Sequence, residues 1–327
     1  MNILLLGAQG QLGWELGASL STLGSVIHYG RGEADFTNLE KLEELVRLTK
    51  PRVIINAAAH TKVDQAETEP LVAHLINAKA PALLAKLARE LSAWLIHYST
   101  DYVFDGLKND PYTEEDIPTP LNVYGHNKLD GDKAILVSGC RHLIFRTSWV
   151  FSFQSCNFAK NILELAKKET SFSVVADQYG SPTGVELLSS ATALALHQAL
   201  HSEKDLSGLY NLVAAGETNW HGYALYLIRR ALEIGWVLAA SPERIYPQES
   251  SKIQPPQIAQ RPANSRLNTA KFTSVFGLTP PPWQYYVDRV LWSWSRFRNI
   301  EMSPPAPPNK IIDLKFIPPL NYQPIHR

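Results

Sequence analysis

Near its start the chain has an apolar run, residues 3–6, followed at once by Gly7, Gly10 and Gly13 and then by leucines at helical spacing. A strand, a glycine turn and a helix in this order predict a dinucleotide-binding turn. The first glycine permits the tight turn, the second lets the backbone approach a pyrophosphate, and the third allows close packing of the helix. An ordinary glycine-rich turn would show the same three glycines, so the prediction depends on the flanking strand and helix.

Short apolar runs alternate with longer amphipathic segments through the first half of the chain. Such runs are typical of strands buried in a parallel sheet, and the segments between them have helical periodicity. The expected strands are residues 3–6, 26–29, 53–56, 94–99 and 143–146, and the expected helices include residues 39–48 and 71–91. The alternation predicts an α/β fold with a doubly wound, Rossmann-type parallel sheet.

The alternation weakens after about residue 150, where the sequence becomes richer in aromatic residues and proline. A chain of 327 residues suits one large domain and a smaller partner. We therefore expect an NAD(P)-binding domain in residues 1–150, to which later segments return, and a mainly substrate-binding domain in residues 151–302. Residues 303–327 are expected to form a proline-rich tail.

The segment after the second expected strand bears on the choice of cofactor. That strand ends at Tyr29, where the ribose of a bound adenosine would lie, and an acidic residue there would favour NAD. The sequence instead continues with Gly30, Arg31 and Gly32, and a guanidinium suits a 2′-phosphate. We predict a preference for NADPH, with NADH as the alternative cofactor. The alternative role for Arg31 is that of a solvated surface residue.

Two segments carry candidate residues for proton transfer. The strand expected at 94–99 runs into Thr100, at the sheet edge where open α/β folds bind ligands. Tyr124 and Lys128 are four residues apart in a helix that Thr119 and Pro120 are expected to start. An ammonium beside a phenol favours its ionised form and so makes it a better proton donor. Since this spacing also occurs on exposed helices, the prediction depends on its combination with Thr100 and the glycine turn.

The charge balance and hydropathy exclude several kinds of partner. The chain has 31 basic and 31 acidic residues without a dense basic run, so we expect no nucleic-acid binding. No apolar stretch approaches the roughly 18–20 residues that span a bilayer, and the start does not resemble a signal peptide, so we expect a cytoplasmic protein with no membrane partner. Cys140 and Cys156 lack metal-like spacing and are expected to be buried thiols.

Six longer segments match the pattern of a known enzyme family. They are Asn56–Thr61, Ser99–Phe104, Pro120–Gly125, Arg146–Val150, Asp177–Gly184 and Arg261–Leu267. On these segments the chain resembles the dTDP-4-dehydrorhamnose reductases, a family of extended short-chain dehydrogenase/reductases. The resemblance extends from Met1 to about residue 292. Epimerases and dehydratases share only the glycine turn and the Tyr/Lys pair.

The resemblance implies roles for further residues. The pyrophosphate is implied to contact Gly10, Gln11 and Leu12. The adenine is implied to lie beside Asp35 and Phe36. The nicotinamide side is implied to be lined by Ala59, His60 and Thr61. The residues implied to contact the sugar are Thr100, Asp101, Tyr124, Lys128 and Trp149. Candidates for phosphate and thymine contacts are Arg261, Asn264 and Arg266. The alternative for this last loop is that its arginines satisfy backbone carbonyls.

Some members of the family bind a divalent metal between subunits through carboxylates. Glu15 and Glu186 fall at matching positions, but the third position is Gln284. A neutral amide weakens a site for a hard cation such as Mg²⁺, so a metal requirement stays open at this point, and the glutamates have the alternative role of helix-surface acids. The resemblance is also compatible with a homodimer.

The implied activity is the NADPH-dependent reduction of the C4 ketone of dTDP-4-dehydro-L-rhamnose to dTDP-L-rhamnose, with a nucleotide sugar as partner. Tyr124 would donate the proton, Lys128 would lower the pKa of the phenol and hold the nicotinamide ribose, and Thr100 would bond the carbonyl. Two alternatives stay open: a catalytically silent, cofactor-binding regulatory subunit, as one relative is, and a nucleotide-sugar epimerase or dehydratase.

Overall fold

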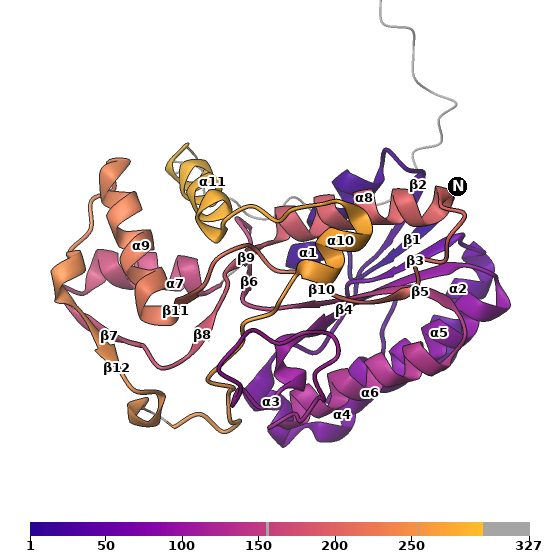
Figure 1. The fold of residues 1–327 in the computed structure, drawn as a ribbon, viewed down its shortest axis with the longest axis horizontal. Coiled ribbons are helices and arrows are strands. Elements are labelled where there is room, and N and C mark those ends of the chain that lie inside the picture. Colours follow the sequence, from indigo (N-terminus) through magenta and orange to yellow (C-terminus); the bar gives the residue numbers. More distant parts are fainter. Residues whose placement is uncertain (155–156, 255, 297–327) are drawn as a thin grey trace, which may run out of the picture.

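The described part of the chain comprises residues 1–154, 157–254 and 256–296 of a computed structural model. Its centre is a six-stranded sheet in the order β10-β5-β4-β3-β1-β2, with every pairing parallel (Figure 1). The strands are β1 Asn2–Leu6, β2 Ser25–Tyr29, β3 Val53–Asn56, β4 Trp94–Thr100, β5 Arg141–Thr147 and β10 Gly208–Asn211. The strand order reverses between β1 and β3, where doubly wound folds bind their ligands. The predicted fold class is confirmed.

Alternate residues of β1 face two layers of helices. Ile3 and Leu5 pack in one core with α1 and α8, and Leu4 and Leu6 pack in the other with α2 and α5. These helices are α1 Gln11–Leu20, α2 Leu39–Thr49, α5 Ala80–Glu90 and α8 Val185–His201. Because both faces of the sheet are covered, its central strands are continuous apolar runs in the sequence.

The helix expected at 71–91 is divided into three pieces. It consists of α4 (Pro70–His74), a π-helical turn (Leu75–Lys79) and α5. The whole stretch Pro70–Glu90 is 21 residues long and, by length and composition, apolar enough to cross a membrane. The expectation that no stretch approaches this size is therefore wrong. The most apolar window of this stretch is 50% buried within the protein, and α5 packs against the sheet. The apolar residues of the stretch therefore belong to a helix that packs on the core.

Smaller elements from the second half lie beside the main sheet in Figure 1. Three two-stranded sheets pair β11 with β8, β12 with β7, and β6 with β9. Their strands are β6 Val150–Phe151, β7 Phe172–Val175, β8 Tyr179–Gly180, β9 Thr183–Gly184, β11 Thr218–Asn219 and β12 Ile245–Gln248. The accompanying helices are α7 Phe158–Lys168, α9 Trp220–Glu233 and α11 Trp283–Arg296.

Segments of the second half also join the main sheet. The strand β10 forms its edge, and α8 and α10 (Ala270–Phe276) contact α1 and β10, respectively. The expected tail from residue 303 and the second cysteine, Cys156, lie outside the described residues. Cys140 is a buried free thiol, as expected.

Candidate active site

The glycine turn between β1 and α1 is tightly closed. Gly7 has a φ of +81°, and a Cβ there would lie 2.6 Å from the backbone nitrogen of Ala58. A Cβ on Gly13 would overlap the carbonyl oxygen of Gly7. Gly10 is the N-cap of α1, so Gln11 and Leu12 form the first turn of the helix. The turn thus presents a helix N-terminus, whose free amides favour an anion such as a pyrophosphate.

The segment after β2 contains an acid that sequence reasoning missed. Arg31 is exposed there, but Glu33 folds back and accepts a hydrogen bond of 3.1 Å from the backbone nitrogen of Gly30. Asp35 accepts from the backbone and the side chain of Thr37, and these bonds hold the pKa of its carboxyl below the ordinary value. Glu33 stands only four residues after the end of β2, and this position in the sequence could have indicated an acid near the expected ribose site.

The loop after β3 is held by the π-helical turn. Asn77 is buried in that turn, and its Oδ1 accepts from the His60 backbone nitrogen at 2.9 Å while its Nδ2 donates to the His60 carbonyl at 3.0 Å. π-Helical turns often occur at functional sites. Ala59 and Thr61, on either side of His60, are exposed. The three residues expected on the nicotinamide side thus lie in one loop whose backbone is fixed at its centre.

The helix that carries Tyr124 and Lys128 begins later than expected. It is α6 (Val123–Val137), and Asn122 is its N-cap, accepting from the Gly125 backbone nitrogen at 2.8 Å. The predicted start at Thr119 and Pro120 is therefore wrong. The reason is that Asn122 is the better N-cap, because its side-chain oxygen accepts from the helix, and its amide also donates to the carbonyl of Gln260, which anchors the cap to a distant loop.

Tyr124 stands near the end of β4, as expected, but its electrostatic setting differs from the prediction. Its ring packs edge-on against Tyr102, with centroids 5.7 Å apart. Burial raises the pKa of its phenol above the ordinary value, and its hydrogen bond with Thr100 opposes the rise. Thr100 Oγ1 also donates to Asp101 Oδ1 at 3.1 Å. Burial is the largest effect on the phenol pKa, so the net shift is upward. The expected lowering of this pKa by Lys128 is not found.

Lys128 is 2% exposed and turns its amine into the protein. Its Nζ donates to the carbonyl oxygen of Tyr98 at 2.5 Å and lies 3.1 Å from Nε2 of His97. Burial lowers the pKa of the lysine to about 8, against the opposing effect of the Asp132 carboxylate. A lysine in this state changes its charge close to neutral pH.

Behind the lysine lies a buried polar cluster that sequence reasoning missed. Asp132 is fully buried, and its Oδ2 accepts from Ser99 Oγ at 2.7 Å and from Arg146 Nε at 3.3 Å. Arg146 is only 3% exposed. Two signals were available: Asp132 stands one helical turn after Lys128, and Arg146 ends an apolar run. Through Asp132, the cluster links α6 to β4 and β5.

Asp101 should make stability depend on pH. Burial raises the pKa of this carboxyl from 3.8 to about 7, although bonds from Ser265 and Thr100 favour the carboxylate. Because the folded-state pKa is higher than the unfolded one, the stabilising contribution is fully present below about pH 4 and is lost as the pH rises through about 7.

Asp101→Asn cannot ionise, so its unfolding free energy should fall less than that of the parent between pH 5 and pH 8. The difference should be roughly 2–3 kcal/mol, at about 1.36 kcal/mol per unit of pKa. Urea unfolding at both pH values measures it. An equal fall in the two proteins would contradict the assignment.

The loop expected to bind the nucleotide makes internal contacts. Arg261 pairs with Asp64 at 2.6 Å and donates to the carbonyl of Ala259. Arg266 bonds Glu217 and the carbonyl of Asn109. Both arginines thus bond backbone carbonyls. This geometry agrees with the alternative role, in which the arginines of this loop satisfy backbone carbonyls.

Two further residues implied to bind the substrate are also engaged. Asn264 donates to the carbonyls of Lys108 and Asp110. Trp149 has a φ of +49° and stacks on Trp220, with ring centroids 3.6 Å apart. The stacked pair offers a flat aromatic surface next to β8, where a Cβ on Gly180 would meet the Trp149 ring.

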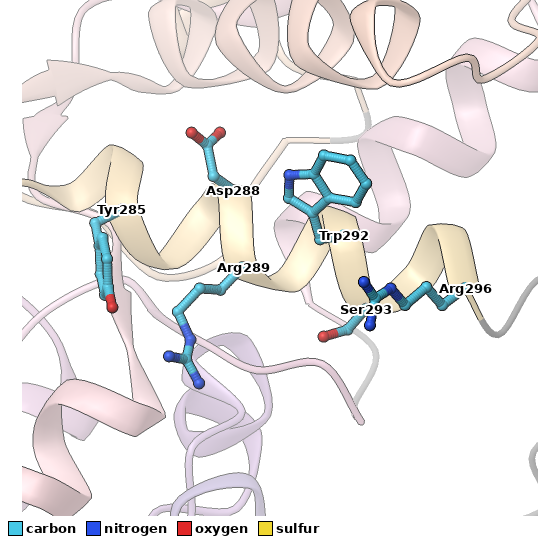
Figure 2. A pocket seen from close by; sticks show the side chains of 6 residues that line it. All are labelled: Tyr285, Asp288, Arg289, Trp292, Ser293 and Arg296. Atoms are coloured by element: carbon cyan, nitrogen blue, oxygen red, sulfur yellow. The ribbon is translucent and has the colours of Figure 1, made fainter.

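The residues at the expected metal positions do not fit a hard cation. Burial raises the pKa of Glu186, and Glu15 raises it further, while the guanidinium of Arg289 lowers it. Figure 2 shows Arg289 and Tyr285 on one side of α11, opposite Asp288 and Trp292. The electrostatics of Glu186 thus include a neighbouring positive charge, and the third position in the sequence is the neutral amide of Gln284, whereas Mg²⁺ needs charged or water oxygens. The described residues contain no group of three or more metal-ligating side chains.

Comparison with known proteins gives a consistent result. Residues 1–296 match the RmlD substrate binding domain family. The chain is 48% identical over 295 residues to the dTDP-4-dehydrorhamnose reductase of Salmonella typhimurium, covering 89% of this chain and 97% of that protein. The corresponding enzyme of Burkholderia thailandensis is 40% identical over 290 residues, covering 88% of this chain and 97% of that protein.

Solved structures agree with this. The dTDP-4-dehydrorhamnose reductase of Bacillus anthracis in complex with NADP superposes with a TM-score of 0.79 at 30% identity, covering 89% of this chain and 99% of that one. The Thermus thermophilus UDP-glucose 4-epimerase in complex with NAD has a TM-score of 0.71 at 17% identity, covering 91% and 99%, and shares the fold alone.

Proposed function

Since the chain belongs to the RmlD family of dTDP-4-dehydrorhamnose reductases, we propose that it binds NADPH over the glycine turn and delivers its hydride to the C4 ketone of dTDP-4-dehydro-L-rhamnose. The chain is an oxidoreductase of dTDP-rhamnose synthesis, and its partner is a nucleotide sugar. The observation that carries the proposal is the shared location of three features: the glycine turn, Thr100 at the end of β4, and Tyr124 at the start of α6.

NADPH supplies the hydride when bound, and the protein supplies position and a proton. The residues of the glycine turn fit NADPH. The N-terminus of α1 suits its pyrophosphate, and Gly7 and Gly13 have no side chain that would obstruct the turn. Tyr124 donates its phenolic proton to the oxygen of the ketone as that oxygen gains charge. Thr100 orients the phenol through their hydrogen bond, and Lys128 carries a positive charge beneath the site once it is protonated.

The main sheet and the smaller elements bind different parts of the reactants. The six-stranded sheet with its helices takes the dinucleotide, and the smaller elements after residue 150 cover the sugar nucleotide. Trp149 faces the sugar, and Arg261, Asn264 and Arg266 hold the loop that closes over it or contact its phosphates directly. We also expect this biosynthetic enzyme to work in the cytoplasm.

The loss of NADPH absorbance on addition of dTDP-4-dehydrorhamnose tests the proposed reaction. Stoichiometric oxidation of NADPH with formation of dTDP-rhamnose is expected. A regulatory subunit would bind NADPH without consuming it, and an epimerase or dehydratase would retain NAD and convert the sugar without net loss of NADPH. Either result would overturn the proposal.

Arg31 should set the preference for NADPH. Its guanidinium stands exposed after β2, where it can pair with a 2′-phosphate. Arg31→Ala should lower kcat/KM for NADPH by about 10–100-fold, the loss of one or two charge-assisted hydrogen bonds, and leave that for NADH nearly unchanged. Arg52→Ala, an exposed arginine at the other end of the sheet, is the control. An unchanged cofactor ratio in Arg31→Ala would remove Arg31 from cofactor recognition.

A further inference from the structure

His97 lies in the middle of β4 and connects Asn56 to Lys128, and the proposed reaction gives His97 itself no role. It is completely buried. Its Nδ1 is 3.0 Å from Nδ2 of Asn56 on β3, and its Nε2 is 3.1 Å from Nζ of Lys128 on α6. The three side chains therefore form a continuous chain from the neighbouring strand to the lysine under the site.

The hydrogen bonds of Asn56 determine which ring nitrogen of His97 carries the proton. The backbone nitrogen of Ala58 donates to Asn56 Oδ1 at 3.2 Å, which requires that the oxygen of the amide points to Ala58. The other end of the amide is then the NH₂ group, and it donates to Nδ1 of His97. An Nδ1 that accepts a hydrogen bond carries no proton, so a neutral His97 carries its proton on Nε2.

The charges around His97 favour its neutral form. Burial lowers the pKa of His97 well below its ordinary value, and Lys128 lowers it further whenever the lysine is protonated. On α6, the nearest carboxylate oxygen, Asp132 Oδ1, is 4.0 Å from Nε2, beyond hydrogen-bonding distance. Asp132 is paired through its other oxygen with Arg146 of β5, so this carboxylate has its own counter-charge. The group closest to Nε2 is Nζ of Lys128.

We propose that His97 is a positioning residue that acts on the reductase reaction through Lys128: with its proton on Nε2, it donates to the amine whenever the lysine is uncharged and so opposes protonation of the lysine. An uncharged amine has two N–H groups and one lone pair. One N–H donates to the Tyr98 carbonyl, and the lone pair accepts from His97. An ammonium has no lone pair, so protonation of Lys128 breaks the bond to His97. His97 thereby influences the pH at which the lysine gains its charge.

The tautomer can be measured without reference to activity. In the full-length protein labelled with ¹⁵N-histidine, long-range ¹H–¹⁵N spectra should show a ring with an unprotonated Nδ1 and a protonated Nε2 that disappears in His97→Asn. A ring with its proton on Nδ1 would overturn the proposal, because Nε2 would then accept from an ammonium. The tautomer is measured in the parent protein, and His97→Gln supplies the assignment if His97→Asn does not fold. It is also independent of whether the proposed substrate is correct.

The functional consequence, which rests on the proposed function, is tested by a pH profile. The kcat/KM for NADPH reports groups of the free enzyme and should fall above about pH 8 in the parent, where Lys128 loses its proton. His97→Asn keeps an acceptor near Asn56 but removes the Nε2 donor, so this limb should move up by about one pH unit.

His142→Asn is the matched control. His142 is also buried, but it lies on β5 two positions before Ile144, the residue that pairs with His97, and its Nδ1 contacts the Cys140 carbonyl. Its high-pH limb should equal that of the parent. An unchanged limb in folded His97→Asn, or an equal shift in the control, would refute the positioning role, whereas absence of NADPH oxidation in the parent would refute the proposed function alone.

Discussion

Tyr124→Phe is expected to lower kcat by about 10²–10⁴-fold, the usual contribution of a positioned proton donor, while NADPH binds as it does to the parent. The substitution retains the ring and its edge-on contact with Tyr102, and removes only the hydroxyl that bonds Thr100. The hydride donor and its site are left in place, so the defect should lie in the chemical step.

Steady-state oxidation of NADPH measures turnover, and quenching of protein fluorescence on titration with NADPH measures binding. Tyr102→Phe is the control, since it removes a neighbouring phenol from the same packed pair and should cause a far smaller decrease in kcat. Near-parental turnover of Tyr124→Phe would exclude this phenol as the proton donor. Loss of NADPH binding in the same variant would show a structural role instead.

Arg146→Met is expected to lower the free energy of unfolding by about 3–5 kcal/mol. The methionine fills much of the volume of the arginine stem, but it leaves the fully buried Asp132 without its counter-charge. Removal of one partner of a buried ion pair costs more than the pair itself contributes, because the remaining charge must be neutralised or solvated inside the protein.

Two variants separate this cause from a general loss of packing. The double variant Asp132→Leu with Arg146→Met removes both charges and should be more stable than Arg146→Met alone. Arg47→Met breaks the exposed pairs with Glu43 and Glu90 and should change the unfolding free energy by at most about 1 kcal/mol. Urea unfolding of all three measures these differences. A loss in Arg146→Met no greater than that in Arg47→Met would show that Asp132 does not need Arg146 as a counter-charge.

The amino-acid sequence by itself determined the fold class, the glycine turn and the place of Thr100 and Tyr124. These are local features: a run of apolar residues is a buried strand wherever it lies, and a turn like that at Gly7 requires glycine because its φ is positive. The order of such elements along the chain then permits few topologies. The similarity to known reductases extends over the same segments.

The tertiary structure alone decided what each polar group contacts. The cap of α6 at Asn122 is linked to Gln260 by a bond across 138 residues, and the direction of Lys128 depends on His97 and Tyr98, which lie 31 and 30 residues away in the sequence. The pKa of a group inside a protein depends on its burial and on the partners that the fold brings to it. The spacing of residues along the chain predicts neither. For this reason a helical spacing of four residues placed the amine and the phenol on one helix, while the packing of β4 against α6 turned the amine towards a histidine.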